Sequence, residues 1–229
     1  MAPDIVLTWP TRPTDELSVH VHRIIHAVTS LGGAVGWLQP PSRERSDAWL
    51  LPLLDEVNGG DAALCVATVD SLPAALGCWR RDDGPIFQHR AQISKVMAHP
   101  HSRGLGLGEL IVSSLVVDAR AKGIETLRLS ARGNNHQAIQ LYERLGFTVW
   151  GRLPDAIEVG DLRFDDVHLY LQFDRPSTVR LMGSLPEGPG SSVAHGHQAD
   201  ADGSPAAPPR GRRPHAPDPA HMRPGSTDQ

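Results

Sequence analysis

A chain of 229 residues, of which 40% are hydrophobic and 21% charged, is long and apolar enough for one globular domain with an appendage. Its formal net charge of −4 provides no basic surface for nucleic acid or an anionic membrane, so neither partner is expected. No apolar run approaches the roughly 20 residues of a membrane-spanning helix, and the opening MAPDIVLTWP lacks a signal-peptide pattern, which predicts a cytoplasmic protein.

The first 60 residues predict one short strand and two helices. The β-prone run 5–9 is followed by a proline and forms the opening strand. Thr14 or Asp15 can cap a helix with one apolar face, which ends near Gly32-Gly33. A second helix is expected over about 43–57. We expect these two helices to help shape the pocket for an acceptor substrate.

Strand-like segments dominate the next part of the chain, and helices alternate with strands after it. Cys65 and Cys78 both lie in strand-like segments and are expected as reduced thiols in the core. The order of elements predicts an α+β fold with a mixed sheet covered by helices. The expected segments are strands at 62–69 and 75–81 with a turn at 70–73, an extended run at 86–98, a helix at about 106–122, a strand at 124–131, a helix at about 135–145, and strands at 147–152 and 167–173.

The composition changes at about Pro176. From there to the last residue the chain holds 10 of its 20 prolines and 7 glycines, with no Phe, Trp, Tyr or Ile. Such a segment cannot bury enough apolar surface to offset the entropy lost on ordering. We therefore expect a folded domain at 1–175 and a disordered tail rich in Pro, Gly and His at 176–229, and the function is sought in the domain.

The stretch SRGLGLGEL places three glycines where the helix at 106–122 begins, although glycine costs a helix about 1 kcal/mol relative to alanine. The first amide N–H groups of a helix lack internal partners and, with the helix dipole, favour anions. Without a Cβ at Gly104, Gly106 and Gly108, a diphosphate can approach these amides, and Arg103 adds a positive charge. The spacing excludes both the Walker loop and the Rossmann fingerprint.

Together with its neighbours, this loop resembles the acetyl-CoA signature of the GNAT N-acetyltransferase superfamily. In VMAHPHSRGLGLG, the fixed places of [RQ]-x-x-G-x-[GA] hold Arg103, Gly106 and Gly108. Downstream, NHQAIQLYERLGF resembles the second family block, N-x-x-A-x-x-x-Y-x-x-x-G-F. The resemblance covers roughly residues 60–173. It implies a central mixed, mostly antiparallel sheet flanked by helices on both faces, with acetyl-CoA as co-substrate and no metal.

The resemblance also implies a role for individual residues. The backbone of Val96, Met97 and Ala98 would pair with the pantetheine arm as a further strand does. Amides from Gly104 to Glu109 would hold the pyrophosphate, Asn135 would lie near the cofactor, and Tyr142 would donate to the departing thiolate as general acid. The implied cofactor-binding residues are Val96, Met97, Ala98, Arg103, Gly104, Leu105, Gly106, Leu107, Gly108, Glu109 and Asn135.

Two features of the chemistry stay open at the level of sequence. A tyrosine of pKa about 10 is a weaker acid than a thiol of about 8.5, so Tyr142 either has a lowered pKa or mainly donates a hydrogen bond. Many family members carry a glutamate base where this chain has Gln92 and Ser130, neither of which can act as a carboxylate base. His89, His168 or a chain of water molecules remain as proton acceptors.

The resemblance thus implies an acetyl-CoA-dependent N-acetyltransferase that acts on a primary amine by direct attack in a ternary complex. The acceptor is expected to be a small molecule such as an amino acid, polyamine or antibiotic. Acetylation of a protein N-terminus or lysine is an alternative, as is a non-catalytic acyl-CoA sensor that has lost its base. A homodimer is left open. The spacings of His20, His22, His26, His99 and His101 do not complete a metal-ligand set, and a loop at 155–165 is expected beside the acceptor.

Overall fold

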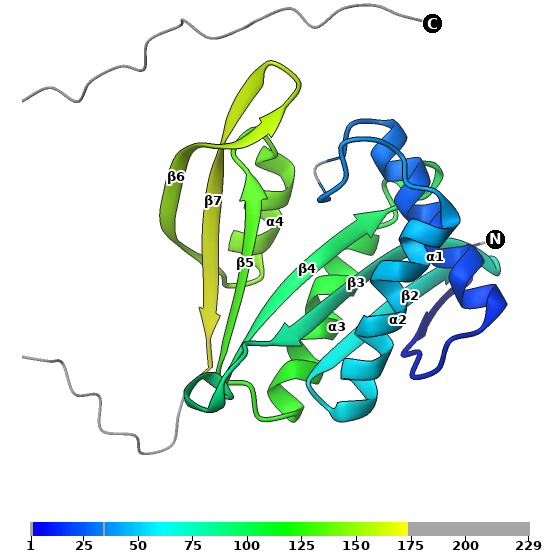
Figure 1. Cartoon of the computed structure of the whole chain (residues 1–229), viewed down its shortest axis with the longest axis horizontal. Coiled ribbons are helices and arrows are strands. Elements are labelled where there is room, and N and C mark those ends of the chain that lie inside the picture. Colours follow the sequence, from blue (N-terminus) through cyan, green and yellow to red (C-terminus); the bar gives the residue numbers. More distant parts are fainter. Residues whose placement is uncertain (1, 34, 174–229) are drawn as a thin grey trace, which may run out of the picture. The chain divides into compact units, whose positions relative to one another are not determined.

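The computed structural model describes residues 2–33 and 35–173 (Figure 1). In this part of the chain seven strands form one sheet in the order β1-β2-β3-β4-β5-β7-β6. Only the β4–β5 pair is parallel, so the predicted α+β fold with a mixed, mostly antiparallel sheet is confirmed. The strands are β1 (Ile5–Thr8), β2 (Ala62–Val69), β3 (Leu72–Arg81), β4 (Arg90–Ala98), β5 (Thr126–Arg132), β6 (Thr148–Val159) and β7 (Leu162–Gln172). The helices are α1 (Asp15–Ser30), α2 (Arg43–Gly59), α3 (Leu107–Ala121) and α4 (His136–Arg144), with short 3₁₀ turns η1 (Pro85–Phe87) and η2 (Pro100–Ser102).

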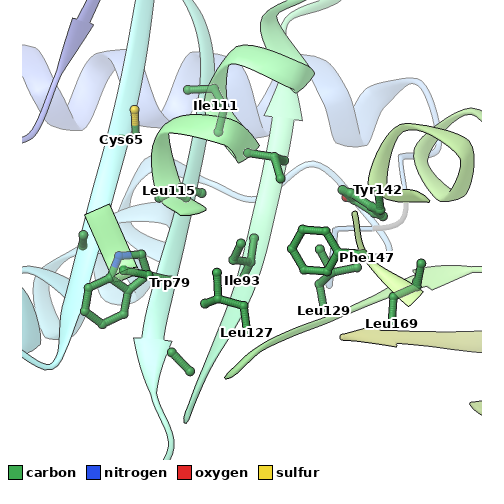
Figure 2. Close-up of a cluster of buried hydrophobic side chains, with 14 of the residues drawn as sticks. Cys65, Trp79, Ile93, Ile111, Leu115, Leu127, Leu129, Tyr142, Phe147 and Leu169 are labelled. Carbon is green, nitrogen blue, oxygen red and sulfur yellow. The ribbon is translucent and has the colours of Figure 1, made fainter. Parts of the chain in front are cut away.

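Each face of the sheet buries its own apolar layer. One layer joins α1 and α2 to β2 and β3, with Ile24 and Leu53 fully buried in it. The other joins α3 and α4 to the opposite face, where Trp79, Ile93 and Phe147 pack (Figure 2). Because helices cover both faces of β2 and β3, most residues of these strands are buried, and their sequences lack polar alternation.

Both cysteines lie in this core, one in each layer. Cys65 belongs to the layer under α3, and Cys78 to the layer under α1 and α2. Both are free and buried. Burial raises the pKa of the Cys65 thiol to about 12 and raises that of Cys78 as well.

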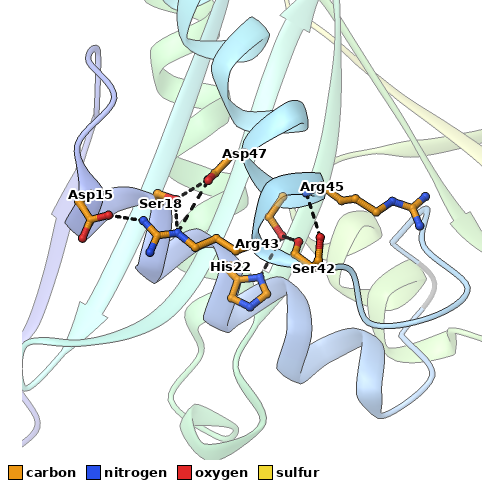
Figure 3. Close-up of polar contacts among 8 residues, drawn as sticks. Asp15, Ser18, His22, Ser42, Arg43, Arg45 and Asp47 are labelled. Atoms are coloured by element: carbon orange, nitrogen blue, oxygen red, sulfur yellow. Dashed lines mark hydrogen bonds and ion pairs between the residues drawn. The ribbon is translucent and has the colours of Figure 1, made fainter.

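Polar contacts fix α1 against the first turn of α2 (Figure 3). Nε of Arg43 donates to the Ser18 hydroxyl at 3.1 Å, and that hydroxyl donates to the carboxylate of Asp47. Nδ1 of His22 lies 3.1 Å from the Ser46 hydroxyl. Ser18 and Ser46 are buried, so these bonds satisfy groups that would otherwise be costly to desolvate. The network therefore anchors the two helices that flank the segment 31–42.

The expected loop at 155–165 was wrong, because β6 and β7 are much longer than the sequence indicated. They form a hairpin that turns at Gly160 and Asp161. Most residues of β6 are exposed, so the outer part of this hairpin has no apolar alternation by which a strand is identified. None of the described helices is long and apolar enough to cross a membrane. The predicted tail at 176–229 lies outside the described residues.

Two smaller corrections concern turns. The turn expected at 70–73 contains only Asp70 and Ser71, both with positive φ (49° and 65°), which is typical of a two-residue hairpin. Pro73 is already in β3, next to a register shift opposite Thr68. The extended run expected from residue 86 begins only at Arg90, because η1 precedes it.

Candidate active site

The parallel strands β4 and β5 pair over only three residues and then separate. The last paired residues are Gln92 and Arg128. On its other edge β4 stays paired with β3 as far as Ala98, opposite Ala75. Figure 1 shows the resulting gap between β4 and β5. In the described sheet, the β5-facing edge of β4 beyond Gln92 therefore has no strand beside it, and such an edge can pair with an extended ligand.

A cavity of about 310 Å³ lies at this separation. It brings together Val96, Met97, Ala98 and Asn135, to which the resemblance assigned carrier binding, with Tyr142, to which it assigned the role of general acid. The remaining lining residues come from the same two strands and from the end of α1 with the segment after it: Val28, Gly33, Val35, Gln92, Ile93, Ser94, Lys95, Leu129, Ser130, Ala131 and Arg132.

The helix that follows β4 begins without a side-chain cap. Gly106 is its N-cap, with left-handed φ 68° and ψ 14°, whereas α1, α2 and α4 each start with a residue whose side chain accepts a backbone N–H. The amide of Leu110 donates the first hydrogen bond of the helix, to the Gly106 carbonyl at 3.0 Å. The amides of 107–109 come before it and have no acceptor within the helix. A Cβ on Gly104 or Gly106 would meet no atom within 4 Å, which leaves room for an anion in front of these amides.

The other residues of this loop divide into anchors and exposed groups. Leu107 is buried in the core and holds the start of α3. Gly108 is half-buried, and a Cβ there would make an ordinary contact with the Leu141 side chain at 3.4 Å. Arg103 and Leu105 are exposed, and the Glu109 carboxylate lies 3.9 Å from the guanidinium of Arg144. The Arg103 guanidinium is therefore free to approach an anion at the loop.

Asn135 and Tyr142 both belong to the helix on the far side of the cavity. Oδ1 of Asn135 accepts the amide of Ala138 at 3.3 Å, so this residue caps α4 as well as lining the cavity. Tyr142 is 7% exposed, and its ring lies 6.1 Å from that of Phe147 (Figure 2).

Burial raises the pKa of Tyr142 to about 12, so the alternative of a lowered pKa does not hold. Full proton transfer from this phenol to the anion of a thiol, whose ordinary pKa is about 8.5, would therefore run uphill. A phenol that stays protonated is suited to donating a hydrogen bond.

The two histidines expected as proton acceptors do not line this cavity. His89 precedes β4 at the end remote from Val96, about 23 Å away at 3.3 Å per residue, so it is too far to act there. His168 is the register partner of Ser130, but its Nε2 lies 3.2 Å from the Asp166 carboxylate and its ring 5.5 Å from Trp150. Among the described lining residues, none carries a carboxylate or an imidazole.

Sequence reasoning missed two cations of the cavity, Lys95 and Arg132. Lys95 has φ 55° and sits where the β3–β4 register shifts, so its side chain leaves the alternation that the sequence implies. Its Nζ donates to the Val35 carbonyl at 2.6 Å and lies 4.2 Å from the centre of the Trp37 ring. Burial lowers the pKa of the Lys95 ammonium.

Arg132 connects this cavity to a second one of about 400 Å³. Its Nε donates to Asn134 at 2.8 Å, and its guanidinium lies 4.8 Å from the centre of the Phe164 ring. The second cavity lies between the segment after α1 and the outer part of the β6–β7 hairpin. Its lining residues are Gly32, Gly33, Gly36, Trp37, Leu38, Arg132, Ile157, Glu158 and Val159.

Four of the five histidines with metal-ligand spacings lie together at another place. His22, His26, His99 and His101 line a separate cavity of about 440 Å³ together with Arg23. Within residues 2–33 and 35–173, no three His, Cys, Asp or Glu side chains come together as a group that could hold a metal ion.

The sequence and the fold are similar to those of known acetyltransferases. The model of the acetyltransferase (GNAT) family matches residues 33–147. The L-amino acid N-acyltransferase MnaT of Escherichia coli is 32% identical over 110 residues, which cover 48% of this chain and 62% of that protein. The L-methionine sulfoximine/L-methionine sulfone acetyltransferase of Salmonella typhimurium is 36% identical over 83 residues, 36% of this chain and 47% of that protein. The chain thus spans less than two thirds of the length of these relatives.

Solved structures share the fold at lower identity. The GNAT superfamily phosphinothricin acetyltransferase of Sinorhizobium meliloti, determined in complex with AcCoA, superposes with a TM-score of 0.61 at 17% identity and covers 82% of this chain and 98% of its own. YncA, a putative acetyltransferase of Salmonella typhimurium determined with acetyl-CoA, gives a TM-score of 0.62 at 21% identity, with 75% and 96% covered.

Proposed function

The chain belongs to the GNAT acetyltransferase family, and from that membership we propose that it transfers the acetyl group of acetyl-CoA to the primary amine of a small molecule of the amino-acid type. The observation that carries the proposal is the separation of β4 from β5, with the start of α3, which has no side-chain cap, separated from the end of β4 by eight residues, and a buried tyrosine in the same cavity. This arrangement offers an extended ligand one strand edge, one anion site and one hydrogen-bond donor.

The residues present fit a carrier that has a diphosphate and an amide-containing arm. The amides of 107–109 would hold the diphosphate, with Arg103 as a further positive charge. The backbone of Val96, Met97 and Ala98 would pair with the arm along the β5-facing edge of β4. Acetyl-CoA supplies an acetyl group activated as a thioester, with a thiolate as the leaving group.

Tyr142 is proposed to act on that leaving group as a hydrogen-bond donor rather than as a full acid. Its raised pKa keeps the proton on the phenol, and the residue lines the cavity at the separation of β4 from β5. Hydrogen bonds to charged groups contribute about 1.5–3 kcal/mol, and the developing thiolate carries charge that the intact thioester does not. A backbone N–H of β4 near Val96 would supply the donor for the carbonyl oxygen.

The charge of the cavity favours an acceptor that carries an acid group over a polyamine. Lys95 and Arg132 line it, and the described lining residues contribute no carboxylate to attract a second ammonium. The named activities of the relatives, on L-amino acids and on methionine sulfoximine or sulfone, are consistent with this class.

A thiol-release assay with acetyl-CoA against a panel of L-amino acids, polyamines, aminoglycosides and peptides tests the proposal. We expect turnover with at least one L-amino acid and a much lower kcat/KM for polyamines. Binding of acetyl-CoA without release of thiol in the presence of any amine would instead favour a non-catalytic acyl-CoA sensor. That second function has one observation in its favour, the Gln92 and Ser130 side chains where a carboxylate base is usual.

A further inference from the structure

Two cations of the cavity are anchored on the same short segment after α1. Nζ of Lys95 donates to the carbonyl of Val35 at 2.6 Å, and Nη2 of Arg132 donates to the carbonyl of Gly32 at 3.5 Å. The two carbonyls are three residues apart, although Lys95 comes from β4 and Arg132 from β5. The side chains therefore converge from opposite sides of the separated strands toward one segment.

The position of Lys95 depends on specific features of the fold. An L-residue at φ 55° is strained by roughly 1–2 kcal/mol, and the bulge at this place is what directs the side chain toward the segment after α1. Gly36 leaves the space that the ammonium occupies, since a Cβ there would lie 2.5 Å from Nζ. The ring of Trp37 covers the ammonium at 4.2 Å. A lysine with only a solubilising role needs none of this.

Both cations retain donors that their protein partners do not use. An ammonium has three N–H donors, and Val35 takes one from Lys95. A guanidinium has five, and Asn134 and Gly32 take two from Arg132. Both residues line the cavity that also contains Tyr142, while the acidic Glu158 lines only the adjoining cavity. A bound anion would thus find two charges with spare donors and no competing carboxylate from the described lining.

We propose that Lys95 and Arg132 together bind the carboxylate of an amino-acid acceptor and so determine which amines the enzyme accepts. This inference rests on the proposed function and adds the residues and the chemical group that select the acceptor. A guanidinium fork and an ammonium are the two side-chain groups best suited to a carboxylate. In an α-amino acid one carbon separates the carboxylate from the amine, so the pair also orients the amine within the cavity.

The positive charge of Lys95 and Arg132 also affects the protonation of the acceptor amine, which must lose a proton before it can attack. A cation close to the bound acceptor disfavours its ammonium form and lowers the pKa of the amine, so that the amine loses its proton to solvent water and attacks the thioester as the free base, with no carboxylate base from the protein. When the carboxylate neutralises one cation, the other still acts on the amine. The charged and titratable groups around Lys95 are Cys78 and Arg80 on β3, Arg132 on β5, Tyr142 on α4 and, from the adjoining cavity, Glu158 on β6.

The test compares Lys95→Met with Lys95→Arg, which keeps the charge. The acceptors are the L-amino acid with the highest kcat/KM in the panel and its carboxamide, which lacks only the acid group. Lys95→Met should lower kcat/KM for the acid at least tenfold more than for the carboxamide, since a charged hydrogen bond contributes about 1.5–3 kcal/mol. Lys95→Arg should recover most of this selectivity, and the kcat–pH profile of Lys95→Met should move up by about one unit.

Equal losses with both acceptors would overturn the inference, because they indicate that Lys95 serves only the structure. A wild-type enzyme that prefers carboxamides or amines without an acid group would also overturn it, while leaving the proposed function intact. Should Lys95→Met not fold, Arg132→Met with Arg132→Lys as its control gives the same comparison.

Calorimetry with N-acetyl-L-methionine and its carboxamide separates this inference from the proposed function, because it requires no turnover. Preferential binding of the acid, abolished in Lys95→Met, supports the anion-binding pair even for a protein that acetylates nothing. Equal binding of acid and carboxamide by the wild type refutes the pair even for an active enzyme.

Discussion

Replacing Tyr142 with phenylalanine isolates the hydroxyl that the proposal assigns to the leaving group. The ring is 7% exposed and packs on Phe147, so phenylalanine preserves the apolar contacts and removes only the oxygen. The thermal midpoint of unfolding and the dissociation constant of acetyl-CoA should therefore change little. The expected effect lies in kcat, because the hydroxyl meets a full negative charge only as the thiolate departs.

The magnitude follows from the protonation state of the phenol. With a pKa of about 12, Tyr142 does not hand its proton over to the thiolate, and its contribution is that of one charged hydrogen bond. Such a bond is worth about 1.5–3 kcal/mol, which predicts a 10- to 150-fold fall in kcat. The raised pKa also predicts that Tyr142 stays protonated throughout the range from pH 6 to about pH 10, so its titration produces no alkaline loss of kcat in that range.

Steady-state thiol release, measured for wild type and Tyr142→Phe with acetyl-CoA and with an acetyl thioester of a more acidic thiol, tests the assignment. The defect should shrink with the better leaving group, because a more stable thiolate gains less from the hydrogen bond. An unchanged kcat would remove Tyr142 from the mechanism. An alkaline limb near pH 9 in the wild type that disappears in Tyr142→Phe would show that the phenol titrates in the ordinary range.

Three further predictions concern the loop, the core and the thiols. Gly106→Val should raise the KM for acetyl-CoA at least tenfold, because the added side chain blocks the amides at the start of α3. Gly106→Asn controls for backbone strain, since asparagine tolerates φ 68°. If both variants bind acetyl-CoA in calorimetry as tightly as the wild type, the diphosphate binds elsewhere. Gly77→Ala should lower the free energy of unfolding in urea by about 1–3 kcal/mol, because the added Cβ would lie 2.6 Å from the Ile111 side chain; equal stability would show that α3 shifts freely. Burial raises the pKa of Cys65 to about 12 and also raises that of Cys78, so both thiols stay protonated at pH 8. They should therefore react with an aromatic disulfide reagent only after the protein is denatured. Rapid labelling of the native protein would contradict this prediction.

The residues proposed to hold the carrier belong to short sequence motifs, and the structure shows the local geometry of these motifs. Amides at a helix start need residues without a Cβ, and the structure shows Gly104 and Gly106 in left-handed conformations that favour glycine. Asn135, Tyr142 and the β4 residues Val96, Met97 and Ala98 were assigned through the family resemblance, and all five line one cavity. The two motifs that carry the resemblance are short runs of consecutive residues, so they can be identified without knowledge of the fold.

The residues proposed to bind the acceptor were not predictable from sequence, because their positions depend on how distant segments meet. Lys95 belongs to a strand, and the alternation of side chains between the two faces of a sheet does not predict that it points toward the segment after α1. Its direction is set by a bulge in the pairing of β4 with β3. The β6–β7 hairpin extends beyond the covered part of the sheet, so its exposed residues carry no apolar period. Arg132 reaches the carbonyl of Gly32, a hundred positions away in the chain, through one hydrogen bond of 3.5 Å.

This division of the site has a physical cause. A carrier that is the same for every member of a family can be held by backbone groups, whose placement tolerates many side chains but demands glycine and a strand edge. An acceptor that differs between enzymes must be selected by side chains, here Lys95 and Arg132, whose positions are set by packing. If that is correct, substitutions in the acceptor-binding residues alone should be enough to remove the preference of the enzyme for acceptors with a carboxylate. These residues are Lys95 and those residues of 32–38, of β5 and of the β6–β7 hairpin that line the two cavities. The dissociation constant of acetyl-CoA should stay constant across such variants, and a coupled loss of carrier binding would show that the two halves are not independent.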